Sequence, residues 1–311
     1  MDAFEAPFRA LGRKVLRERG TALALACTIA IALGGCAKTV VSEDLAGFGK
    51  AANAIGQQAD LTFVQSNKLI RDVSIDRFVR SRAPGLAESQ FQVAVTRAEI
   101  DAWTESLTAL GDYGAGLASL VDSRRGAQTS DALILLGQKL NNGVVGTNIN
   151  PGIASAFASL GGALVDARAQ GEARRILQKT DPSIQTLLGE MASAIGDSDA
   201  QGLRGTVLTN WNTSFNGVRS AYGSAAEKGD EAAQRRLVAE YLAGLDRRDA
   251  QLRSLANLRA SLVNLGAAHA AAAKGAPATV DGLLAQVERR LDETKRLYQA
   301  FEKDQDKKGD K

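Results

Sequence analysis

Histidine is almost absent from this chain: its 311 residues include a single one, His269. A Ser-His-Asp triad would have to use this residue, and a zinc site could draw on at most one imidazole. The motifs GxSxG, HExxH and CxxC and the P-loop are absent too. We therefore predict a non-enzymatic protein with no catalytic residues and no metal site, in which His269 is a tolerated position of an alanine-rich helix.

Cysteine is nearly as rare. Cys27 lies inside an apolar stretch and Cys36 lies at its end. A chain cut between them would keep one thiol and could form no intramolecular disulfide. In an oxidising compartment, its stability would then have to come from packing.

Aromatic residues make up 5% of the chain and proline occurs five times, whereas alanine, leucine, glutamine, arginine and glutamate recur throughout. This bias suits long helices far better than strands. With 45% hydrophobic residues, the chain can also bury a sizeable core. The composition predicts an all-α fold.

The N-terminus has the three parts of an export signal. A basic segment ends at Arg19, an apolar run extends from Thr21 to Leu33, and Gly34 and Gly35 precede Cys36. The alternative is an uncleaved membrane helix, but the apolar run falls short of the roughly 20 residues that span a bilayer.

The sequence Leu33-Gly34-Gly35-Cys36 resembles the lipobox of bacterial lipoproteins. The resemblance implies cleavage between Gly35 and Cys36, a diacylglyceryl group on the Cys36 sulfur, and an acyl chain on the new amine. These covalent lipids are the only attached groups expected; no other cofactor is predicted. Ala37 follows the cysteine, which by the same resemblance favours the outer membrane, facing the periplasm, over the inner membrane.

Once the export signal is set aside, the charge of the remaining chain argues against nucleic acid as a partner. The first 35 residues hold five of the 38 basic and three of the 35 acidic side chains, which leaves 33 and 32. A net charge of +1 over the remaining 276 residues gives no electrostatic footprint for nucleic acid.

Apolar periodicity and breaker residues divide the rest of the chain into helices. We expect them at about 43–82, 87–124, 130–140, 153–179, 182–228 and 231–273, followed by a last helix after Pro277. We expect a loop at the Asn-rich residues 141–152 and a helix start at Asp181-Pro182. We also expect that Asp197-Ser198-Asp199 can interrupt the helix at 182–228.

The last helix has the cleanest pattern, an apolar seam with alternating spacings of four and three at positions 280, 284, 287, 291, 294, 298 and 301. The preceding helix carries leucines at 252, 255, 258, 262 and 265, and the link between the two is short. The two should pair as an antiparallel coiled coil. Since the longest helices would reach roughly 60 Å, we predict an elongated bundle of long antiparallel helices.

One stretch carries a candidate binding site. Trp211 and Phe215 lie one helical turn apart within the polar run 210–216. Trp211 reads first as a core anchor; the functional alternative is a partner-binding edge formed by Trp211 and Phe215 with Asn148 and Asn150 of the loop.

The predicted organisation is a signal peptide at 1–35, a lipidated tether at 36–43, a helical bundle at 44–303 and a charged disordered tail at 304–311. We expect a lipid-anchored envelope protein that acts as a scaffold or binding partner for another envelope protein. Two alternatives stay open: a periplasmic cell-wall enzyme or enzyme regulator, and an immunity or exclusion lipoprotein. The sequence predicts no oligomeric state.

Overall fold

The computed structural model describes residues 42–82, 85–91, 93–121, 155–156, 158–162 and 173–309. All of them belong to one compact unit, Thr39–Lys311. Several predicted features lie outside the described residues: the export signal, Cys36, the helix expected at 130–140, and the loop expected at 141–152 with Asn148 and Asn150. Within these residues the regular structure is helical and there is no strand, which confirms the all-α prediction.

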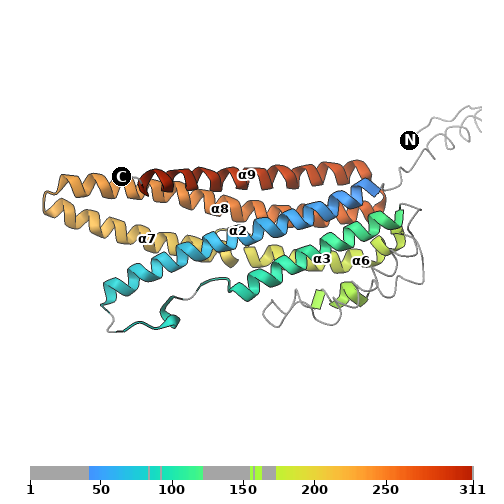
Figure 1. The fold of residues 1–311 in the computed structure, drawn as a ribbon, viewed down its shortest axis with the longest axis horizontal. Helices are drawn as coiled ribbons and strands as arrows, with labels where there is room; N and C mark the ends of the chain where they lie inside the picture. The colour runs from blue at the N-terminus through green and yellow to red at the C-terminus, as the bar shows by residue number, and fades with distance from the viewer. Residues whose placement is uncertain are drawn as a thin grey trace, which may run out of the picture. The chain divides into compact units, whose positions relative to one another are not determined.

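Helices α2 (Ser42–Ser81) and α3 (Arg97–Val121) pack closely along each other (Figure 1). Glycines make this approach possible. A Cβ added at Gly49 would lie 2.7 Å from the Gly111 carbonyl oxygen, and one at Gly114 would lie 2.8 Å from the Gly49 nitrogen. The bounds of α2 agree with the helix predicted at 43–82.

The helix predicted at 87–124 begins ten residues late, so this prediction is wrong at its start. A short 3-10 helix, η1 (Glu88–Phe91), comes first, and α3 starts at Arg97. Thr96 explains the boundary: its hydroxyl accepts the Glu99 N–H at 3.2 Å, while the Glu99 carboxylate accepts the Thr96 N–H at 2.6 Å. In addition, the Asn67 side chain on α2 accepts the Val95 N–H at 3.1 Å, which fixes the chain outside a helix there.

Helix α6 (Ala173–Ile195) runs straight through Pro182, so the prediction of a helix start at Asp181-Pro182 is wrong. Residues on both sides of the proline share one buried stripe, with Leu177 before it and Ile184 and Leu187 after it. Continuing the helix keeps the whole stripe in the core, and this outweighs the hydrogen bond that proline cannot donate.

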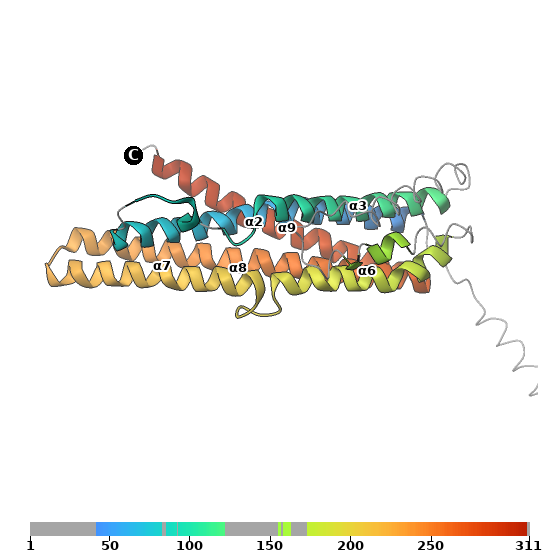
Figure 2. The same ribbon diagram turned by 90° about the horizontal axis from the view of Figure 1, so that it is seen from below.

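The interruption expected near residues 197–199 is confirmed: α6 ends at Ile195 and α7 (Gly202–Glu227) begins seven residues later. Gly196 and Gly202 flank this loop with φ values of +106° and +56°, a region that favours glycine. Figure 2 shows α6 and α7 following one another along α8 (Glu231–Lys274), with the loop projecting between them.

Helices α8 and α9 (Pro277–Gly309) form the predicted antiparallel pair. The seam of α9 is buried at Val280, Leu284, Val287, Leu291 and Thr294, and that of α8 at Leu255, Leu258, Leu262 and Leu265. Asp230 caps the start of α8 by accepting the Ala233 N–H, and Gly275 ends it in a left-handed conformation. Helix α9 extends to Gly309, past residue 303.

None of the helices that the structure describes is both long and apolar enough to cross a membrane.

Candidate functional site

A buried polar cluster joins three helices around His269. The Nδ1 atom of His269 on α8 lies 2.8 Å from a carboxylate oxygen of Asp181 on α6. Its Nε2 atom lies 2.9 Å from the hydroxyl of Tyr113 on α3, and that hydroxyl lies 2.6 Å from the hydroxyl of Thr180. Phe48 of α2 closes the cluster, with its ring centre 5.6 Å from the imidazole. One set of side chains therefore ties α3, α6 and α8 together under α2.

Burial sets the electrostatics of the cluster. Tyr113 is fully enclosed, and desolvation raises the pKa of its hydroxyl far above the usual value. The hydrogen bond from His269 is the main reason that the pKa of Asp181 is lowered; burial works against it, and a hydrogen bond from Gln185 adds to the lowering. Tyr113 therefore stays a neutral hydrogen-bonding group while Asp181 is held as a carboxylate.

The two hydroxyls can reverse their hydrogen bonds without moving. In one arrangement the imidazole is neutral and its Nδ1–H donates a hydrogen bond to the Asp181 carboxylate. Nε2 then accepts a hydrogen bond from the Tyr113 hydroxyl, and the Thr180 hydroxyl donates to the Tyr113 oxygen. When the imidazole carries both protons, Nε2 donates to Tyr113, Tyr113 donates to Thr180, and Thr180 donates to the Ile176 carbonyl oxygen at 2.8 Å. Every member has a partner in both states.

Solvent access determines what this cluster can do. Tyr113 has 0% and His269 2% of its surface exposed; only the Asp181 side chain reaches solvent, at 25%. A substrate could not reach the imidazole or the phenol in this arrangement. The groups of an acid–base catalyst are present, but their position makes them a structural core network.

Sequence reasoning missed this cluster because its partners lie 88 and 156 residues from His269. The burial of His269, however, could have been predicted from the sequence. The leucine seam at 258, 262 and 265 continues at a spacing of four to His269, and this spacing puts the imidazole on the buried face of α8.

The predicted aromatic site lies in the core. Trp211 and Phe215 are 7% and 2% exposed and stack with ring centres 5.4 Å apart. The Trp211 indole N–H donates to the Gln251 side chain at 2.8 Å, and Gln251 donates to the Gln65 carbonyl oxygen on α2. Because so little of either ring is exposed, their packing matches the core-anchor interpretation and offers no aromatic contact surface.

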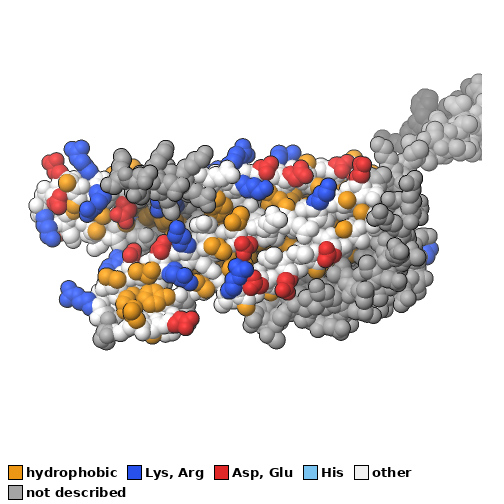
Figure 3. Space-filling model, viewed as in Figure 1, with side chains coloured by type: hydrophobic (Ala, Val, Ile, Leu, Met, Phe, Trp, Pro, Cys, Tyr) orange, Lys and Arg blue, Asp and Glu red, His pale blue; other side chains and the backbone are white. Residues whose placement is uncertain are grey.

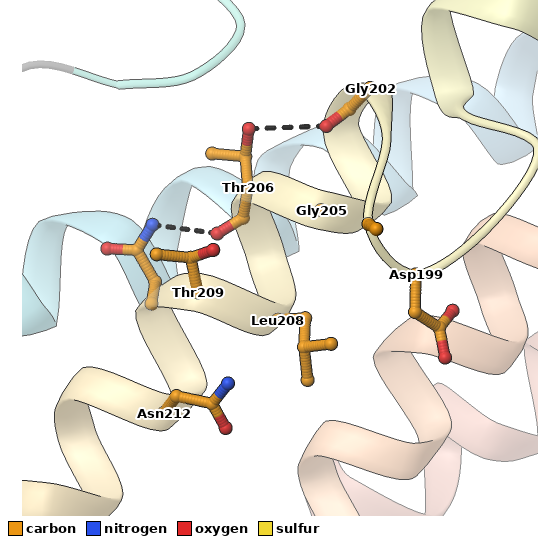
Figure 4. Close-up of a pocket in the computed structure, with 9 residues that line it drawn as sticks. Asp199, Gly202, Gly205, Thr206, Leu208, Thr209 and Asn212 are labelled. Atoms are coloured by element: carbon orange, nitrogen blue, oxygen red, sulfur yellow. Dashed lines mark hydrogen bonds between the residues drawn. The ribbon is translucent and has the colours of Figure 1, made fainter.

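The polar neighbours of these aromatics face outward instead. A surface hollow of about 590 Å³ is lined by Asp199, Ala200, Gly202, Gly205, Thr206, Leu208, Thr209, Asn210 and Asn212 (Figure 4). Thr206 donates to the Gly202 carbonyl oxygen, and the Asn210 amide donates to the Thr206 carbonyl oxygen at 2.9 Å. The run 210–216 therefore divides into an inner aromatic face and an outer face of amides and hydroxyls.

Among the described residues that line this hollow, only Asp199 is acidic, and it is paired with Arg204. In the described parts of the chain, no three His, Cys, Asp or Glu side chains lie together as a metal site would require. The hollow offers hydrogen-bonding groups suited to recognition.

Comparisons with protein-family models, with curated proteins and with solved structures find no match for this chain.

Proposed function

We propose that this protein is a lipid-anchored scaffold of the bacterial cell envelope that binds another envelope protein. The observation that carries the proposal is the lipobox-like sequence Leu33-Gly34-Gly35-Cys36, followed after a few residues by a helical bundle that starts at Ser42. Acylation at Cys36 would place the bundle at a membrane surface, facing the periplasm, with the outer membrane favoured over the inner by Ala37.

Lipid chains supply the attachment in this proposal. Each buried CH₂ contributes about 0.8 kcal/mol, and two or three chains hold a protein far more firmly than the single myristoyl chain that binds marginally.

The hollow beside α7 is the contact surface in this proposal. Thr209 and Asn212 are exposed there, and the core anchors Trp211 and Phe215 hold the same helix in place from the other side. Amide and hydroxyl groups on a rigid helix suit a polar protein segment, since they offer donors and acceptors without the cost of burying a charge. A non-enzymatic role is further supported by the enclosure of the one histidine.

Membrane fractionation tests the anchor. We expect the Cys36→Ala variant to lose processing and lipid attachment, whereas the matched Cys27→Ala variant should be processed and anchored like the unsubstituted chain. Identical behaviour of the two variants would contradict the anchor.

Site-specific photocrosslinking in native membranes tests the contact surface. A photoreactive residue at Asn212 should give a discrete crosslinked product, whereas one at Thr186, an exposed threonine on α6, should not. Equal labelling at both positions, or none at Asn212, would contradict the hollow as the binding surface.

A further inference from the structure

Helices α7 and α8 form another hollow close to the turn that joins them. Figure 2 shows the two helices running side by side up to this turn, at the left end of the view. The hollow has a volume of about 290 Å³, near the lower end of the range for ligand pockets. It is lined by Val218, Arg219, Tyr222, Leu237, Val238 and Tyr241, and we call these six residues the tip pocket.

Most of the tip pocket is apolar or aromatic. Tyr222 and Val238 are 40 and 45% exposed, so a ligand can reach them. Tyr241 is partly buried, and its ring packs edge-on against Phe215 with ring centres 5.1 Å apart. Phe215 in turn stacks on Trp211 in the core. This series of aromatic contacts fixes one wall of the pocket, so that the apolar surface is formed before a ligand arrives.

Arg219 is the one charged residue of the tip pocket, and two contacts hold its guanidinium there. Nη2 donates to the Tyr241 hydroxyl at 2.8 Å, and Nη1 donates to the Asn216 side-chain oxygen at 3.1 Å. The guanidinium carbon also lies 5.3 Å from the centre of the Tyr241 ring. These contacts use only part of the N–H donors of the guanidinium.

The charge of Arg219 has no acidic partner among the described residues: both side chains that it bonds are neutral. Two acids beside the turn are engaged elsewhere. Asp230 accepts the Ala233 N–H, and Glu231 lies 4.0 Å from Arg235. Figure 3 shows basic and acidic side chains interspersed at this end of the molecule, on the left of the view, so the surrounding surface has no field of one sign. Arg219 therefore supplies the charge selectivity of the pocket.

We infer that the tip pocket binds a medium-chain monocarboxylate, with the carboxylate on Arg219 and the hydrocarbon chain against Tyr222 and Val238. A guanidinium matches the planar fork of a carboxylate, and one positive charge balances one carboxylate. A phosphate monoester carries about −1.5 to −2 at neutral pH and would leave negative charge uncompensated in an apolar pocket. The inference depends neither on lipid attachment nor on the hollow at Asn212.

Photolabelling of the purified full-length protein in lipid nanodiscs tests the ligand class. The probes are decanoate and decanol, each with a diazirine at the end of its chain, and mass spectrometry locates the label. At neutral pH, we expect the acid probe to label the peptides that contain Tyr222 or Val238 roughly fivefold more than the alcohol probe, because only the acid gains a charge-assisted hydrogen bond. Equal labelling by the two probes, or no label on either peptide, would overturn the inference.

Removing the guanidinium tests the role of Arg219. In Arg219→Gln, labelling by the acid probe should fall to the level of the alcohol probe. Arg236→Gln is the matched control, because Arg236 is an exposed arginine beside Leu237 that does not line the pocket, and it should label like the unsubstituted chain. Unchanged labelling of Arg219→Gln, or an equal loss in both variants, would contradict the inference.

Filling the pocket gives a test that leaves Arg219 in place. Val238→Trp should reduce labelling of the Tyr222 peptide severalfold, because the larger ring would occupy the hollow. Val263→Trp is its control, since Val263 is 47% exposed on the same helix and lies outside the pocket. A Val238→Trp variant that labels like Val263→Trp would also overturn the inference.

Discussion

The hydroxyl of Tyr113 lies 2.9 Å from Nε2 of His269, although 156 residues separate the two along the chain. This contact fixes α3 against α8 inside the core, and Thr180 and Asp181 add α6 to it. Such a network is worth most when every member is satisfied, since removing one leaves buried polar groups without a partner.

Replacing Tyr113 with phenylalanine should destabilise the protein by about 1–3 kcal/mol. The ring stays, but Nε2 of His269 and the Thr180 hydroxyl both lose their contact with the phenol. Denaturant unfolding measures the change. Tyr222→Phe is the control, because Tyr222 is 40% exposed, and it should unfold like the unsubstituted chain. Equal stability of all three proteins would show that the network contributes nothing.

The stability of the protein should depend on pH through Asp181. Its pKa is lowered in the folded state, chiefly by the hydrogen bond from His269. Its contribution is therefore full above the unfolded pKa of about 4 and is lost as pH falls through the lower folded value. We expect the stability advantage of the unsubstituted chain over Asp181→Asn to shrink as the pH is lowered below about 4.

The His269→Leu background checks the cause of this pH dependence. Without the imidazole, the Asp181→Asn substitution should change the acid side of the stability profile much less. An acid dependence of the same size in both backgrounds would assign it to other carboxylates.

Two glycine substitutions should have opposite effects. In Gly114→Ala, the added Cβ would lie 2.8 Å from the Gly49 nitrogen, so α2 and α3 must separate, at a cost of about 1–3 kcal/mol. Gly189 lies on α6 with nothing within 4 Å of the added atom, and Gly189→Ala should stabilise the helix by about 0.5–1 kcal/mol. Thermal unfolding distinguishes them: the melting temperature should fall for the first and rise for the second. A fall in melting temperature for both variants would mean that the close contact between α2 and α3 is not what makes Gly114→Ala destabilising.

The start of α3 can be tested at Thr96. Thr96→Ala removes the acceptor of the Glu99 N–H and should cost about 1 kcal/mol, whereas Thr96→Ser keeps a hydroxyl and should cost much less. Denaturant midpoints for the two variants provide the measurement. Equal losses for alanine and serine would attribute the effect to the threonine methyl group.

Much of the fold follows from local patterns. The α8 and α9 seams are predictable because apolar spacing on a helix directly reports which face is buried, and Asp230 and Gly275 mark the ends of α8 with ordinary capping chemistry. The start of α3 could also have been predicted, because Thr96 and Glu99 have the spacing of a capping box. The apolar residues before Thr96 instead led to the prediction of a longer helix.

The failures have a common cause in long-range contacts. Pro182 stays inside α6 because core packing on both sides of it outweighs a local preference. The cluster at His269 depends on residues from three helices, and no spacing within one segment encodes their meeting. Trp211 packs against Phe215 and donates to Gln251, as the core-anchor interpretation expects. Spacing within this segment did not show that Asn210 and Asn212 line a separate outward-facing hollow.

Mass spectrometry of the N-terminal peptide from native membranes is the decisive measurement for the proposed lipid anchor at Cys36. We expect the peptide to begin at Cys36 and to carry the mass of a diacylglyceryl group, with or without an added acyl chain on the amine. An unmodified Cys36 in a chain that retains residues 1–35 would contradict the claim.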